Sequence, residues 1–205
     1  MVAYPEIVRN TSAHVYHLFH KQYSDSALYH NYNHTVEVVS HVEEIAKGMK
    51  LNAEERDIVI IAAWFHDTGY LQSRKDHEAL SASIASRFLH EQHYSEENIK
   101  KVVGCITATK VPQQPTSVIE QVMCDADLLN LGKKDGLEKG EILHKEMEQA
   151  LGKSISEIEW IKQTIVFFQQ HSYHTEYVRR NYNKGREENL SKLEEQLHSL
   201  ELKAQ

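Results

Sequence analysis

Glycine and proline are scarce in this chain, with 8 Gly and 3 Pro among 205 residues. Folds rich in tight turns depend on these two residue types, so their scarcity argues against an all-β architecture. Cysteine is scarcer still. The two cysteines, Cys105 and Cys124, lie in apolar helical contexts and outside any CxxC pair. This placement argues against a thiolate zinc site and predicts two buried thiols in a reducing compartment.

Long apolar runs and an excess of positive charge are also missing. No run approaches the roughly 18–20 apolar residues that a membrane span needs. The first ten residues, "MVAYPEIVRN", lack the basic start and apolar stretch of a signal peptide. The formal net charge of −7 disfavours a nucleic-acid backbone as a partner. The sequence therefore predicts a cytoplasmic protein that binds neither a membrane nor a nucleic-acid duplex.

Most segments of the chain have apolar residues at helical spacing. Residues 52–67 begin with Asn52 and Glu55, a capping-box pattern, and continue into the apolar run "IVIIAAWF". This continuity favours a helix buried on most sides over a buried strand. Similar patterns predict helices in residues 12–23, 34–49, 76–92, 95–109, 116–132, 154–171 and 186–204. Because no internal repeat or linker is found, we expect one all-α domain over residues 1–205.

Ionisable side chains interrupt the apolar segments at three places: "YHNYNHTVEVV", the pair His66–Asp67, and "CDADLLNLG". Burying an ionised carboxylate alone costs many kcal/mol, so these groups must pair with one another or bind a cation. Imidazole and carboxylate ligands without sulfur suit a divalent ion such as Mn, Fe, Co, Ni or Zn. Mg is a further candidate for a cofactor of this type.

Five segments occur in a fixed order between Tyr29 and Gly132: "YHNYNH", "AAWFHDTGY", "HEALSA", "ITATK" and "DADLLNLG". Together they resemble the HD superfamily of metal-dependent phosphohydrolases, and most closely its subgroup of predicted metal-dependent HD phosphohydrolases. The resemblance implies an all-helical fold with a metal between helices. It implies a motif core over residues 29–132, with the C-terminal helices of residues 133–205 packing on it. By position, the metal ligands would be His34, His66, Asp67 and Asp127.

The resemblance also bears on the number of metal ions. Asp127 occupies the ligand place of the motif, whereas Asp125 would lie one helical step aside, as a partner of a ligand or as a charge at a helix N-terminus. Two-metal members of the superfamily have further histidines between the doublet and the last aspartate. His77 occupies one such place here, but Lys110 stands where a second is expected. We therefore expect one tightly held ion and allow a second, weaker one bridged by Asp67.

The activity that the resemblance implies is hydrolysis of a phosphate ester or anhydride by a metal-activated water. Asp67 would be both ligand and proton acceptor, and His77 and Lys110 would be further catalytic groups facing the phosphate. His30, Arg74 and Lys110 are the candidate substrate contacts. The expected substrate is a nucleotide or another small phosphorylated metabolite.

Two other readings stay open. A sensor module with an HD fold would hold a metal and a nucleotide without turnover. An HD-type oxygenase would need a di-iron centre and extra ligands that the sequence does not offer. The sequence leaves open the substrate, the physiological metal and the oligomeric state, and a homo-oligomer is compatible with it.

Overall fold

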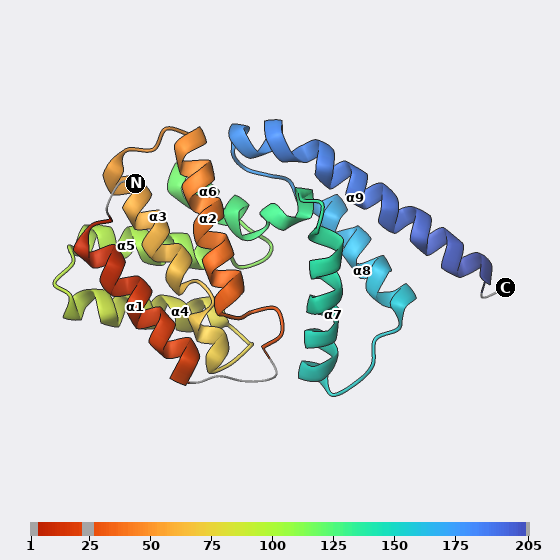
Figure 1. The fold of residues 1–205 in the computed structure, drawn as a ribbon, viewed down its shortest axis with the longest axis horizontal. Coiled ribbons are helices and arrows are strands. Elements are labelled where there is room, and N and C mark those ends of the chain that lie inside the picture. The colour runs from red at the N-terminus through yellow and green to blue at the C-terminus, as the bar shows by residue number, and fades with distance from the viewer. Residues whose placement is uncertain (1–3, 22–26, 204–205) are drawn as a thin grey trace. The chain divides into compact units, whose positions relative to one another are not determined.

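The computed structural model describes residues 4–21 and 27–203, and it is all-α, with no strand among these residues (Figure 1). The all-α prediction is therefore confirmed. The chain divides into two compact units, Met1–Asp127 and Leu128–Gln205, and each is described by itself. A single domain over residues 1–205, with the C-terminal helices packed on the motif core, stays a prediction. None of the helices in the described part combines the length and the apolar character that a membrane span requires.

The first unit is built around α3 (Ala53–Phe65), which packs against five other helices (Figure 1). These are α1 (Glu6–Lys21), α2 (Tyr32–Gly48), α4 (His77–Glu91), α5 (Glu96–Ala108) and α6 (Val118–Asp127). The helix begins at the predicted capping box, in which the Asn52 side chain accepts from the Glu55 N–H and the Glu55 carboxylate accepts from the Asn52 N–H. Every residue from Ile58 to Phe65 except Trp64 is buried. The helical interpretation of "IVIIAAWF" is confirmed.

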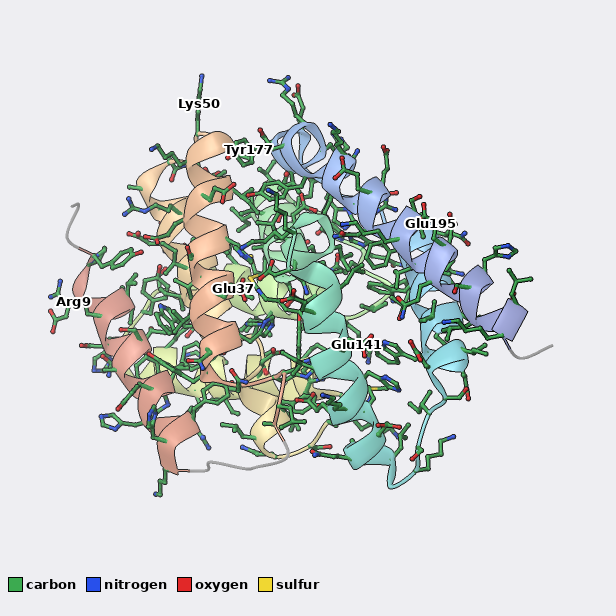
Figure 2. All side chains as sticks on the ribbon, turned by 45° about the vertical axis from the view of Figure 1, so that its right-hand side comes forward. Arg9, Glu37, Lys50, Glu141, Tyr177 and Glu195 are labelled. Carbon is green, nitrogen blue, oxygen red and sulfur yellow. The ribbon has the colours of Figure 1, made fainter. Side chains whose placement is uncertain are left out.

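Burial of α3 makes its C-terminal end a rigid place. Burying each of its larger apolar side chains contributes roughly 1.5–3 kcal/mol, so a polar residue attached to this end has little freedom to move. Two charged side chains illustrate the exposed outside of the unit. Arg9 on α1 and Lys50 after α2 are exposed and point away from it (Figure 2). Cys105 and Cys124 are free thiols and are buried, as predicted, and burial raises the pKa of both.

Helix α6 ends earlier than the sequence pattern indicates. The apolar spacing predicts one helix over residues 116–132, but α6 ends at Asp127 and a separate 3₁₀ turn, η2 (Leu129–Gly132), follows. Leu128 lies between them with φ −101° and ψ 15°, outside the helical region, which interrupts the α-helical hydrogen bonding. The break leaves Asp127 at a helix end, and Leu129 and Leu131, which follow it, are buried.

The second unit contains η2 and three helices, α7 (Gly136–Leu151), α8 (Glu157–Gln170) and α9 (Glu176–Lys203). Helix α7 is not among the predicted helices, and its buried residues are Gly136 and Glu146. Helix α9 begins ten residues before the predicted range 186–204, where the Val178 N–H donates to the Thr175 hydroxyl. Asn189, buried in α9, donates to the carbonyls of Leu131 and Lys133 and ties this helix to η2.

A close backbone contact fixes α4 against η1 (Thr68–Leu71), the 3₁₀ turn that follows the His66–Asp67 pair. The Gly69 N–H donates to the Ser81 hydroxyl at 2.8 Å. A Cβ atom at Gly69 would lie 2.2 Å from the carbonyl oxygen of His77 and 2.7 Å from the backbone nitrogen of Ser81. Only glycine allows this approach, and the approach places the start of α4 beside the doublet.

We expect Gly69→Ala to lower the free energy of unfolding by about 1–3 kcal/mol, because two backbone segments must separate to accommodate the methyl group. Urea denaturation measures the change. The control is Gly140→Ala in α7, where a Cβ atom would meet nothing within 4 Å. That variant should gain about 0.5–1 kcal/mol from helix propensity. Equal stability in the two variants would contradict the contact.

Candidate metal centre

The ends of three helices bring four of the sequence-predicted residues together. His34 lies in the first turn of α2, His66 and Asp67 directly follow α3, and Asp127 is the last residue of α6. Helix α2 begins where it does because the Asn31 side chain accepts hydrogen bonds from the backbone N–H groups of Asn33 and His34. Since α2, α3 and α6 pack against one another, their ends meet inside the first unit.

The donor atoms are spaced as ligands of one ion would be. His66 Nε2 lies 3.1 Å from Asp67 Oδ2 and 3.4 Å from Asp127 Oδ1. His34 Nε2 lies 3.4 Å from Asp67 Oδ2 and 3.5 Å from Asp127 Oδ1. Four atoms bound tetrahedrally at about 2.1 Å from a metal would be roughly 3.4 Å apart. In the described part of the chain, His34, His66 and Asp127 are the group identified as able to hold a metal ion.

The hydrogen bond of His66 Nδ1 directs the other ring nitrogen, Nε2, toward the carboxylates of Asp67 and Asp127. Its Nδ1 lies 2.8 Å from the carbonyl oxygen of Ala63, which can only accept, so Nδ1 carries the proton and donates. His66 Nε2 and Asp67 Oδ2 are both buried, and neither has a hydrogen-bond partner among the described residues. Leaving such groups unsatisfied costs about 1–3 kcal/mol each. A divalent cation would satisfy both atoms, so the donor set fits a metal.

The pKa shifts in the cluster also indicate that it would stabilise a bound cation. Burial opposes the charged form of His66, but the negative charges of Asp67 and Asp127 raise its pKa well above the usual value. Burial also opposes ionisation of Asp67, but the charge of His66 lowers the pKa of this carboxyl group. The pKa of Asp127 is lowered too, against the effect of burial, because the imidazoles of His34 and His66 lie against its carboxylate. The cluster is therefore a place where positive charge is stabilised.

His77 and His30 lie beside the four residues. His77 Nε2 is 3.5 Å from Asp67 Oδ1, and its Nδ1 donates to the Arg74 carbonyl at 3.1 Å. Burial opposes protonation of His77, but hydrogen bonding to Asp67 raises its pKa. The ring of His30 stacks on Tyr70 with 4.2 Å between centroids and lies 6.0 Å from the ring of His77. One face of Asp67 thus meets the proposed ligands, and the other meets His77.

The remaining sequence-predicted residues lie around this arrangement. Lys110 forms an ion pair with Asp76, at 2.8 Å, and both side chains are exposed. Since Asp76 immediately precedes His77, the pair lies next to the start of α4. Arg74 contacts His77 through its backbone carbonyl. The roles of Lys110, Arg74 and His30 in substrate binding stay predictions.

Asp125 is fully buried in the last turn of α6, so the reading that places it as a charge at a helix N-terminus is wrong. The sequence pattern also does not single out two neighbours of the site, Tyr70 and His41. Tyr70 ends the motif "HDTGY", which is the one signal that could have selected it. His41 lies seven residues after His34, hence on the same face of α2, and this spacing is its only signal.

We expect one divalent ion to bind per chain with release of about one proton at neutral pH, because His66 must lose its proton before Nε2 can coordinate. Because the pKa of His66 is raised, protons compete with the metal for Nε2. The affinity for the metal should therefore fall as the pH is lowered. Isothermal titration calorimetry in buffers of different ionisation enthalpy measures both quantities.

His66→Ala should remove tight binding together with the proton release. His144→Ala is the matched control, because His144 also bonds a backbone carbonyl, that of Ile155 at 3.0 Å, but belongs to the second unit. Equal metal affinity in wild type and His66→Ala would contradict the proposed ligand set.

Comparisons with known proteins agree with the residues assembled here. A family model described as the HD domain matches residues 31–131, the range that carries all four proposed ligands. A search of curated proteins found no match. A crystal structure described as a predicted HD superfamily hydrolase, from an uncultured Thermotogales bacterium, is similar with a TM-score of 0.59 and 22% identity, covering 96% of this chain and 92% of that one. At this identity the likeness concerns the fold. The family match shows that residues 31–131 of this chain are an HD domain.

Proposed function

We propose that this protein is a metal-dependent phosphohydrolase that cleaves a phosphate ester or anhydride bond of a small substrate. The observation that carries the proposal is the spacing of 3.1–3.5 Å between the imidazole nitrogens of His34 and His66 and the carboxylate oxygens of Asp67 and Asp127. Two imidazoles and two carboxylates would hold Mn, Fe, Co, Ni, Zn or Mg. When bound, such an ion supplies Lewis-acid charge and activates water at neutral pH.

The two carboxylate oxygens of Asp67 face different side chains, which supports two roles for this residue. Oδ2 faces His34 and His66 and belongs to the proposed ligand set. Oδ1 faces His77 Nε2. Because the Arg74 carbonyl holds the proton of His77 on Nδ1, any second proton must reside on Nε2, toward Asp67. Asp67 and His77 can therefore exchange a proton at these two atoms, with Asp67 accepting from the attacking water and His77 donating to the leaving group.

The phosphate would approach from the side of His77. The exposed Lys110–Asp76 pair lies beside His77, and an exposed ion pair contributes little to stability, so Lys110 can exchange its carboxylate partner for a phosphoryl oxygen. Arg74 and His30 are proposed to bind the rest of the substrate. We propose a nucleotide or another small phosphorylated metabolite as that substrate, and we propose the cytoplasm as the location.

The sensor reading uses the same ligand set, so turnover is what separates it from the hydrolase. A second ion would find His77 Nε2 and Asp67 Oδ1 3.5 Å apart, which supports a weaker bridged position. A di-iron oxygenase is supported less well, because its second ion would need further ligands beyond His77 Nε2 and Asp67 Oδ1.

A panel assay tests the proposal. Wild-type protein, loaded separately with each of the six metals, is incubated with nucleoside monophosphates, cyclic nucleotides, nucleoside triphosphates, alarmones and a chromogenic phosphate ester. The products are separated by anion-exchange chromatography and identified. We expect turnover that a chelator abolishes. Metal and nucleotide binding without turnover on any substrate would favour the sensor.

On the substrate identified, we expect Asp67→Ala to abolish turnover while circular dichroism remains helical, because one side chain serves as ligand and as proton acceptor. Residual activity within about tenfold of wild type would mean at most about 1.4 kcal/mol of lost transition-state stabilisation. Such a result would contradict the dual role of Asp67.

We expect His77→Ala and Lys110→Ala each to lower kcat/KM by roughly ten- to a thousandfold, about 1.4–4 kcal/mol, with metal content unchanged. Lys101→Ala is the control, since Lys101 forms a similar exposed pair with Glu97 at 2.7 Å. It should keep wild-type kinetics. Loss of metal in His77→Ala would identify His77 as a ligand, and full activity in Lys110→Ala would place the phosphate elsewhere.

A further inference from the structure

The C-terminal end of α6, which carries Asp127, is held by side chains from outside the helix. The last four carbonyl groups of an α-helix lack donors within the helix. Here the Ala126 carbonyl accepts a hydrogen bond from His41 Nδ1 at 2.9 Å, and the Cys124 carbonyl accepts one from the Gln113 amide at 3.4 Å. Ala126 immediately precedes Asp127. The bond from His41 therefore acts on the peptide unit to which the proposed ligand is attached.

Water cannot easily take the place of the imidazole. Ala126 is fully buried, and His41 is only 5% exposed. Removing the His41 N–H would leave the Ala126 carbonyl without that donor, at a cost of about 1–3 kcal/mol, or make the last turn of α6 shift to find another. A shift of that turn would move the Asp127 carboxylate relative to the other donor atoms.

Helix α2 thereby connects two of the proposed ligands. His34 and His41 are seven residues apart, about two turns, so they lie on the same face of α2. His34 supplies a donor atom, and His41 binds the backbone next to Asp127. The Glu37 carboxylate lies one turn away on the same helix, with its Oε1 3.6 Å from His41 Nε2. It faces the other ring nitrogen, so the His41 ring lies between the Ala126 carbonyl and the Glu37 carboxylate.

We propose that His41 is a positioning residue that sets the place of Asp127 in the metal centre through the Ala126 carbonyl. This inference rests on the proposed metal function of the cluster. It assigns His41 no contact with metal or substrate. A merely structural role would lower stability alone, whereas a positioning role changes the affinity and the coordination spectrum of a metal bound to folded protein.

The test compares His41→Asn with His41→Gln. The Asn amide can place its N–H near the position of Nδ1, whereas the longer Gln amide reaches toward the position of Nε2. Co²⁺ is the probe, because its visible absorption reports coordination geometry. We expect His41→Gln to bind Co²⁺ roughly ten- to a hundredfold more weakly, with altered visible bands, and His41→Asn to stay within about threefold of wild type.

His144→Asn is the matched control, because His144 bonds the Ile155 carbonyl through Nε2 and the shorter Asn amide would lose that bond. Its Co²⁺ affinity should equal that of wild type. Thermal unfolding of the metal-free variants shows which are folded, and the titrations are made on folded protein. Equal Co²⁺ affinity and equal spectra in His41→Asn, His41→Gln and wild type would overturn the inference. Failure of wild type to bind Co²⁺, or binding that survives His66→Ala, would instead overturn the proposed metal function.

Discussion

The burial of His66 and Asp67 at the end of α3 is the constraint on which the first unit depends. The two residues are 1% and 4% exposed, and the penalty for removing such charges from water amounts to several kcal/mol for each. Only opposite charge in the same small volume can offset it. The Asp127 carboxylate and the His34 imidazole lie in that volume, and a metal ion would supply positive charge there. The ends of α2 and α6 must therefore meet the end of α3.

Precision in this arrangement comes from hydrogen bonds between side chains and backbone groups. The side chain of Asn31 fixes the first turn of α2, the carbonyl of Ala63 orients the ring of His66, and the carbonyl of Arg74 orients that of His77. Each of these bonds determines which ring nitrogen is protonated or where a helix begins. Donor atoms held in this way need little reorganisation when a cation or a proton arrives.

The sequence pattern predicts the residues of the site better than the details of their surroundings. His34, His66, Asp67 and Asp127 follow from a motif, and the structure brings their side chains together. Helix α7 is not among the predicted helices, although its apolar residues are spaced as in an amphipathic helix. The break after Asp127 depends on the backbone of one residue, Leu128, within a continuous apolar pattern. The role of His41 depends on which carbonyl lies opposite it, and no linear pattern contains that information.

Gly69 has a consequence for how this architecture can diverge. The backbone of η1 and that of α4 touch at this residue, so the distance between Asp67 and His77 is set by the absence of a side chain. A relative with any larger residue at the equivalent position would have to carry α4 farther from the doublet. Its histidine there would no longer reach the aspartate, and the second face of that carboxylate would need a different partner. The residue after His–Asp–Thr therefore divides relatives that can share this proton-exchange geometry from those that must have replaced it.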